Sequence, residues 1–301
     1  MPINSIATAS KWSNQLDKMI SEEAVTGFLA DNVLRAKFVG AKTVLVPDVD
    51  FVGLADYDRD NGFSRGKVTV ANTSFTLSKD RARSLQLDRE DLDETGVAEL
   101  AGKLLGEFVR TQVIPETDAY VLSKLSTVAT DRNHSVNFDD SAPVAQLLSL
   151  ISNIQEQVGY RGELVAFVDA TAYAALMNSE EISKYITVSN FKQGEINMQV
   201  KSINGTAIIP VTADRMKTAF NFDAGTTTTT GGFTPAEDAK NIRMLVLPKK
   251  GASLVKKTET MRIFTPESNQ EADAYVFNYR VYYDAFVKKS GLDSIYCAVA
   301  E

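Results

Sequence analysis

The chain has 301 residues, 44% of them hydrophobic and 24% charged, a balance that suits a globular protein of one large or two modest domains. Its net charge of −7 argues against a protein whose main task is to grip nucleic-acid phosphates, because that task needs a basic patch. Cys297 is the only cysteine, which excludes an intrachain disulfide and a cysteine-based zinc site. Without a run of about 18 apolar residues or a secretory leader, we expect a soluble protein that is intracellular when made and has no membrane partner.

Residues 1–40 predict an N-terminal arm, because they mix small, polar and charged residues with only an intermittent helical pattern. A β-branched run from Thr43 to Val46 follows, then the turn sequence "DYDRDNGFSRG", and then strand-like alternation from Lys67 to Leu87. We read Thr43 to Leu87 as one long, charged hairpin within an extended loop over residues 41–94. This hairpin carries too little apolar surface to close a core of its own.

A long amphipathic helix is predicted next, over about Thr95 to Thr130. Apolar residues fall at helical spacing from Val97 to Phe108, and acidic residues just before this stripe suit a helix N-terminus. Pro115 interrupts the pattern, and "ETDAYVLSKLSTVAT" resumes it. We therefore expect two collinear helices or one long kinked helix.

The polar stretch Asp131 to Asp140 predicts a linker that ends the first unit. Ser141 is expected to cap the next helix, which has Pro143 in its first turn and Gly159 after its end. The segment "ELVAFV" predicts a buried strand, and Asn204-Gly205 predicts a tight hairpin turn. Alternating strands and helices indicate a small α/β domain over residues 141–235.

The low-complexity segment "GTTTTTGG", Gly225 to Gly232, predicts a mobile surface loop. Strands follow it, and the last long one alternates aromatic residues from Tyr275 to Tyr283 on one face. We interpret that face as packing against a core helix, because it lacks the interleaved basic residues of a base-stacking surface.

Three patterns faintly suggest chemistry, and a structural explanation is preferred for each. The sequence "GFSRGKV" has the wrong glycine spacing for a phosphate-binding loop. The sequence "DYDRDNG" lacks the last glutamate of a calcium loop and reads as a solvated turn. His134, the only histidine, is expected to be exposed in the linker, with no nucleophile motif nearby. No catalytic residue, metal or cofactor is expected.

The order of these units resembles the major capsid proteins of tailed bacteriophages, of the Hong Kong 97 type. The most suggestive local sequences are "QVIPETDAYVLSKL", Gln112 to Leu125, and "ADAYVFNYRVYYDAFV", Ala272 to Val287. The resemblance implies an α+β fold with an N-terminal arm (1–40), an extended β-hairpin loop (41–94), a peripheral domain with a long spine helix (95–140 and 236–301) and an α/β axial domain (141–235).

The same resemblance implies a structural, non-catalytic coat protein. Its copies would form hexamers and pentamers of an icosahedral shell around double-stranded DNA, with scaffolding and portal proteins as further partners, assembled in the cytoplasm of a bacterial host. The extended loop would then contact neighbouring subunits, and its charges would set register and partner choice. The expected contact residues are Asp56, Asp58, Arg59, Asp60, Phe63, Arg65, Lys67, Lys79, Arg81 and Arg83.

Two alternatives stay open at this point. A bacterial nanocompartment shell of the same fold would hold an enzyme cargo instead of a genome. A carbohydrate- or nucleotide-processing enzyme would carry its site in the α/β domain and would need a pocket with clustered ionisable groups.

Overall fold

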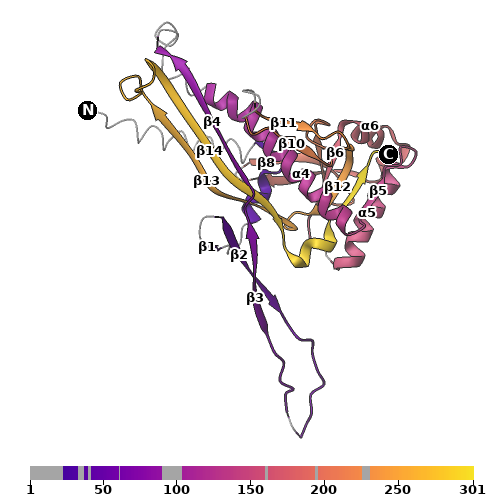
Figure 1. Cartoon of the computed structure of the whole chain (residues 1–301). Coiled ribbons are helices and arrows are strands. Elements are labelled where there is room, and N and C mark those ends of the chain that lie inside the picture. The colour runs from indigo at the N-terminus through magenta and orange to yellow at the C-terminus, as the bar shows by residue number, and fades with distance from the viewer. Residues whose placement is uncertain are drawn as a thin grey trace.

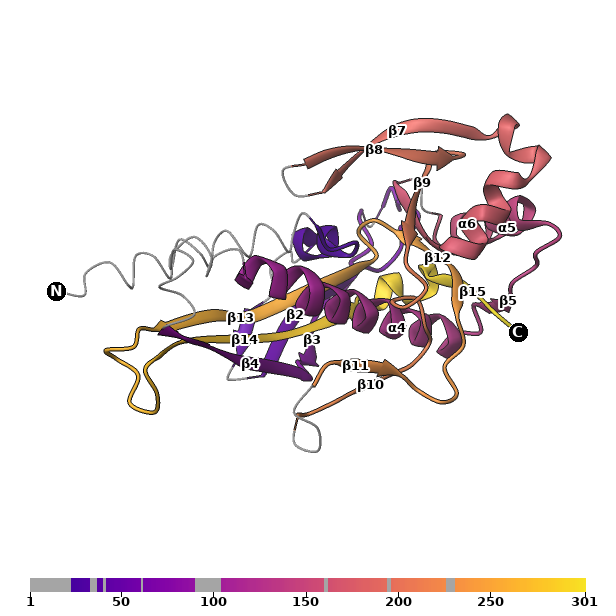
Figure 2. The same ribbon diagram turned by 90° about the horizontal axis from the view of Figure 1, so that it is seen from above.

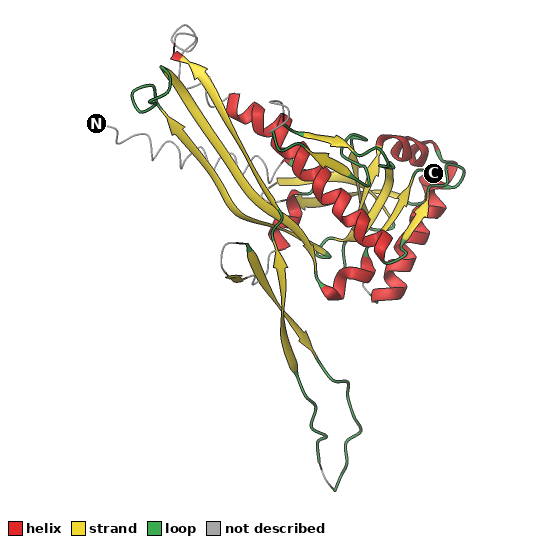
Figure 3. Ribbon diagram, viewed as in Figure 1, coloured by secondary structure: helices red, strands yellow, loops and turns green. Residues whose placement is uncertain are grey.

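The computed structural model describes residues 23–32, 37–39, 42–60, 62–89, 104–159, 162–193, 196–225 and 231–301. Most of the arm expected over residues 1–40, the start of the expected long helix and the threonines of the low-complexity loop lie outside these residues. Figures 1 and 3 show a body of sheets and helices from which one long hairpin projects. The architecture is mixed α+β, as predicted.

A mixed seven-stranded sheet forms one half of the body. Its strand β6 (Leu164–Asp169) is buried along its whole length, as the segment "ELVAFV" predicts, because both faces of the sheet are covered. The strand order is β5-β15-β12-β6-β9-β8-β7. The other strands are β5 (Ser135–Asn137), β15 (Tyr296–Val299), β12 (Ile242–Pro248), β9 (Thr206–Val211), β8 (Ile196–Ile203) and β7 (Ile186–Gln193).

The strands β12 and β15 lie beyond residue 235 in the chain, where the α/β domain is expected to end, but they belong to its sheet. The sequence pattern groups them with the peripheral strands, yet both are hydrogen-bonded in the sheet of β6 and β9. The turn between β8 and β9 is as predicted, with Asn204 at φ 50° and Gly205 at φ 79°. These positive φ angles are what a two-residue hairpin of this kind requires.

Alternate residues of β6 enter two different cores. Val165 and Phe167 pack with residues of the helix α4 (Ile114–Asp131). Ala166 and its alternate neighbours pack instead with α5 (Pro143–Val158) and α6 (Ala170–Asn178). This division follows from the two-residue period of a strand. Figure 2 shows the α5 and α6 pair lying apart from α4.

The prediction for α5 is confirmed at the end of the helix and wrong at its start. Gly159 follows the helix at φ 58° and its N–H bonds to the Gln155 carbonyl, as predicted. At the start, however, Ala142 is the capping residue and no side chain caps the helix. The expectation for Ser141 is wrong, because its hydroxyl donates to Asp139 Oδ1 over 2.6 Å.

The long helix passes through Pro115 without a break. Residues 104–108 are α-helical, η2 (Val109–Val113) is a π-helical turn, and α4 continues to Asp131. Proline has no N–H to donate to the carbonyl four residues earlier, and a local π-turn accommodates that loss. Of the two expected forms, the structure has one long helix with a local irregularity, and its residues 104–131 span about 40 Å.

A three-stranded sheet, in the order β13-β14-β4, forms the other half of the body. Its strands are β13 (Ala252–Phe264), β14 (Ala274–Val287) and β4 (Lys79–Asp88). The rings of Tyr279 and Tyr283 on β14 make edge contacts with Phe108 and Tyr120 of the long helix, at 6.0 and 5.7 Å. The aromatic face of β14 is therefore core packing against a helix, as predicted.

The prediction of one continuous strand from Lys67 to Leu87 is wrong, because the structure has two strands there. The projecting strand β3 (Thr69–Thr76) ends two residues before β4 begins, and β4 pairs with β14 in the body. Alternation persists through Leu77 and Ser78 because both sheets have the same two-residue period. The projecting hairpin is consequently shorter than expected.

Residues 24–32, near the N-terminal end of the described chain, pack into the body. The short helix η1 (Gly27–Asn32) buries Phe28, whose ring lies 6.0 Å from Phe167 and 5.4 Å from Phe191. Just before it, Thr26 donates from its N–H and its hydroxyl to the buried carboxylate of Asp118, over 3.0 and 2.7 Å. Residues 24–32, which the sequence places in the arm, are thus packed against the body.

His134 is half-buried, not an exposed linker residue. Its ring stacks on Tyr296 at 4.1 Å and 6°, because β5 extends the sheet beside β15. The remaining short elements are η3 (Glu180–Lys184), η4 (Lys289–Ser294), β1 (Lys37–Val39), and the paired strands β10 (Phe220–Phe222) and β11 (Phe233–Pro235).

Candidate functional site

The projecting hairpin extends beyond the body, so most of its surface is not covered by the rest of the chain (Figure 1). The strands β2 (Thr43–Asp50) and β3 pair antiparallel along their whole length, and β1 adds a short third strand. Residues 51–68, which we call the hairpin tip, continue away from the body (Figure 1). Their one isolated β-bridge joins Asp58 to Gly62.

The turn of the hairpin tip is set by local chemistry. The N–H of Gly62 bonds to the carbonyl of Asp58 over 2.8 Å, and Gly62 adopts φ 80°. The Asp58 side chain accepts from the N–H of Asp60 over 2.8 Å, an Asx-turn. The segment "DYDRDNG" thus forms the exposed turn that the sequence predicts.

Large apolar side chains of the hairpin tip face solvent. Phe51 is 77% exposed, Phe63 is 87% exposed, and Leu54 is fully exposed. Tyr57 and Phe63 make an edge contact at 5.1 Å, while both remain mostly exposed. Scattered exposed apolar residues are ordinary, but a protrusion lined with them marks a surface that another molecule covers.

The expected contact residues fall into two groups. Seven lie exposed on the hairpin tip: Asp56, Asp58, Arg59, Asp60, Phe63, Arg65 and Lys67. The other three, Lys79, Arg81 and Arg83, lie on β4 in the body. Lys79 is half-buried, with its ammonium 3.8 Å from the centre of the Phe222 ring.

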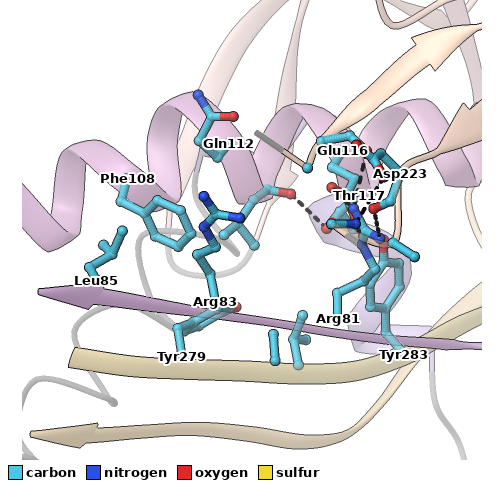
Figure 4. A pocket seen from close by; sticks show the side chains of 17 residues that line it. Arg81, Arg83, Leu85, Phe108, Gln112, Glu116, Thr117, Asp223, Tyr279 and Tyr283 are labelled. Carbon is cyan, nitrogen blue, oxygen red and sulfur yellow. Dashed lines mark hydrogen bonds and ion pairs between the residues drawn. The ribbon is translucent and has the colours of Figure 1, made fainter. Parts of the chain in front are cut away.

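Arg81 is bound within its own chain. Its Nε and Nη2 donate to the two carboxylate oxygens of Glu116 on α4, over 2.6 and 3.0 Å. Its guanidinium also donates to the carbonyl of Asp223, just before the low-complexity loop, and to that of Gly232 at its end (Figure 4). Burial would lower the pKa of Arg81, but the hydrogen bonds and charge of Glu116 outweigh it and raise that pKa.

The expectation that Arg81 and Arg83 belong to the projecting hairpin is therefore wrong. Both line a cavity of about 350 Å³ between β4, β14 and the long helix. Figure 4 shows Arg83 near Tyr279 in this cavity. That any of the ten expected residues, Arg81 included, contacts another subunit stays a prediction.

Sequence reasoning missed the apolar residues of the hairpin tip, above all Phe51, Val52 and Leu54. An apolar run is usually read as a core segment, and these residues directly follow a strand. A usable signal is the glycine at position 53. It lies within the apolar run of residues 51–55, and a glycine inside such a run weakens the case for a buried strand.

Two further findings limit other kinds of site in the described part of the chain. No group of three or more His, Cys, Asp or Glu side chains lies there in positions that could hold a metal ion. None of its helices is both long and apolar enough to cross a bilayer.

Comparison with known proteins gives matches in structure alone: no protein-family model and no curated protein matches the chain. The capsid structure of the cyanophage P-SCSP1u aligns with a TM-score of 0.58 at 12% identity, over 88% of this chain and 85% of that one. The mature capsid of bacteriophage PhiM1 aligns with a TM-score of 0.51 at 13% identity, over 86% and 82%. The virus-like particle from Pyrococcus furiosus aligns with a TM-score of 0.53 at 14% identity, over 98% and 99%. The chain is thus built on the fold of bacteriophage capsid proteins, as the resemblance in its sequence predicts.

Proposed function

We propose that this chain is the major capsid protein of a tailed bacteriophage. Copies of it would assemble into hexamers and pentamers of an icosahedral head that encloses double-stranded DNA. The observation that carries the proposal is the hairpin tip, whose apolar side chains are exposed in the single chain and need a partner surface. A second copy of the chain is the partner that a closed shell supplies at every position.

The charges of the hairpin tip would give these contacts their register. Aspartates at positions 56, 58 and 60 and basic residues at positions 59, 65 and 67 place charges of both signs within a short segment. Such mixed charge contributes partner choice more than affinity, and salt screens it over roughly 10 Å at 0.1 M. Phe51, Leu54 and Phe63 would supply the apolar contact area.

The acidic net charge is compatible with this role, because a shell confines DNA without gripping each phosphate. Scaffolding and portal proteins would be further partners, and the virion the final location. The arm, the extended loop, the peripheral domain and the axial domain belong to this proposal. One change is needed: the seven-stranded sheet takes β12 and β15 from beyond residue 235.

The test separates apolar contacts from charge. In one variant Phe51, Leu54 and Phe63 are replaced by serine; in a second, Asp56, Asp58 and Asp60 are replaced by asparagine. Because all these side chains are exposed, the free energy of unfolding of the unassembled chain should stay within about 0.5 kcal/mol of the unmodified value for both variants.

We expect the apolar variant to lose closed particles in electron microscopy, and the charge variant to assemble with a changed salt dependence. Normal particles from the apolar variant would refute the assignment of the hairpin tip as a contact. Particles of the unmodified protein that protect DNA from nuclease would support a head, whereas a co-purifying enzyme cargo would support a nanocompartment. The comparisons do not favour the latter, since capsids of phages such as P-SCSP1u and PhiM1 align over most of the chain.

A further inference from the structure

The projecting hairpin is joined to the body by a very short link. Only Leu77 and Ser78 separate β3, which belongs to the projecting sheet, from β4, which belongs to the body. Any change of angle at these two residues is carried along the whole hairpin. The contacts of this link therefore help to set where the hairpin tip lies, beside the contact of Lys257 of β13 with Phe38 of β1.

One side of the link is apolar. Leu77 and Val44, from the base of the hairpin, are buried against Tyr282 and Phe286 of β14. The ring of Phe75 lies 4.7 Å from that of Phe286. This cluster holds the base close to the body, but apolar contacts are non-directional and tolerate sliding.

The other side of the link is a polar network centred on Asp284, whose side chain is only 1% exposed. Its Oδ2 accepts from the N–H of Ser78 over 3.0 Å, and its Oδ1 accepts from the hydroxyl of Tyr120 over 2.7 Å. Lys124 forms an ion pair with the same Oδ1. The hydroxyls of Ser78 and Tyr120 lie 2.9 Å apart and close the network.

This network joins three separate elements at one carboxylate: the link, the long helix and β14. Burial raises the pKa of Tyr120, and its hydrogen bond to Asp284 raises it further, so the phenol remains a neutral donor. Buried polar networks of this kind add little net stability over apolar packing, but they fix relative orientation.

The geometry gives that orientation a long reach. The eight residues of β3 span about 26 Å at about 3.3 Å per residue. A rotation of about 10° at the link would move the far end of β3 by roughly 4–5 Å, and the hairpin tip by more. Contacts between shell subunits depend on registry far finer than this.

We propose that Asp284 is a positioning residue, which fixes the direction in which the hairpin leaves the body and so narrows the range of particle sizes. The second half of this statement rests on the proposed function. The first half concerns the single chain and can be tested without assembly.

The direct test measures a distance in the unassembled full-length chain. Spin labels are placed at Val70→Cys on β3 and Asp131→Cys at the end of α4, both exposed positions. Cys297 is fully buried, and burial raises the pKa of its thiol, so it stays unlabelled. Pulsed electron spin resonance then gives the distribution of the distance between the labels.

The variants Tyr120→Phe and Asp284→Asn should each broaden this distribution at least twofold. Tyr120→Phe removes a single hydroxyl, which keeps the test valid if Asp284→Asn does not fold. The matched control is Asp118→Asn, another buried carboxylate of the same body, which bonds Thr26 and Arg215 and no residue of the link. It should lower the unfolding temperature without broadening the distribution.

An unchanged width in both network variants, or equal broadening in the control, would overturn the proposal. Particles of the two variants should also show a wider range of diameters in electron microscopy. If the distance distribution broadens but the particle diameters do not change, the proposed effect of Asp284 on particle size is overturned. If the unmodified chain forms no particles, the proposed function fails, while the distance measurement still decides the role of Asp284.

Discussion

Replacing Phe28 by alanine should strongly destabilise the single chain, because the segment around it is part of the core. Phe28 is only 2% exposed and contacts two further rings, Phe167 and Phe191. Truncating a buried phenylalanine costs about 3–5 kcal/mol, which includes the loss of such ring contacts. We expect a loss of about 4 kcal/mol.

The assay is urea-induced unfolding of unassembled subunits, with calorimetry beside it. At about 2 °C per kcal/mol for a chain of this size, the unfolding temperature should fall by roughly 8 °C. The matched control is Phe63→Ala on the hairpin tip, where the ring is 87% exposed and the change should stay within about 0.5 kcal/mol.

A loss below about 1 kcal/mol for Phe28→Ala would refute the reasoning. It would mean that the segment leaves the core in the unassembled chain. Equal losses for Phe28→Ala and Phe63→Ala would contradict the difference in burial between the two rings.

Two further predictions concern ion pairs of β4. Arg81→Ala should lower the free energy of unfolding by about 2 kcal/mol, because the half-buried guanidinium donates both to the Glu116 carboxylate and to two carbonyls. A double-mutant cycle with Glu116→Ala should show a coupling energy of about 1–2 kcal/mol. A coupling energy near zero in urea unfolding would contradict this. Asp80 has a lowered pKa because of its hydrogen bond from Arg280, so it stabilises the fold above about pH 4 and loses this effect as the pH falls through the lowered value. The urea midpoint of the unmodified chain should thus fall more steeply below pH 4 than that of Asp80→Asn, and parallel declines would count against the pairing.

Features set by local chemistry could be predicted from the sequence. Asn204-Gly205 and Gly159 need positive φ angles, which few residues adopt, so their turns were placed correctly. The helical stripe survived Pro115, because a π-turn absorbs the missing hydrogen bond over a few residues. The charged residues from Asp56 to Asp60 predict an exposed turn, because they cannot form a core.

Features set by distant pairing could not be predicted. Arg81 lies in a strand pattern continuous with the hairpin, and only its pairing with β14 shows that it belongs to the body. Ser141 has the right residue type for a cap, but Asp139 competes for its hydroxyl. The polar network around Asp284 unites residues up to 206 positions apart, and no single segment carries a sign of it.

The pairing of β4 with β14 also imposes an order of events during synthesis. The two strands are nearly 200 residues apart in the chain, and Ser78 must meet Asp284 before the link is held. At about 5–20 residues per second, a ribosome needs about 10–40 s to produce the second strand after the first. During that interval the hairpin exists without its anchor, so a nascent chain lacks a fixed direction for its adhesive surface. If the proposed function holds, subunits would become competent to join others only after nearly the whole chain has been made, which would separate translation from assembly in time.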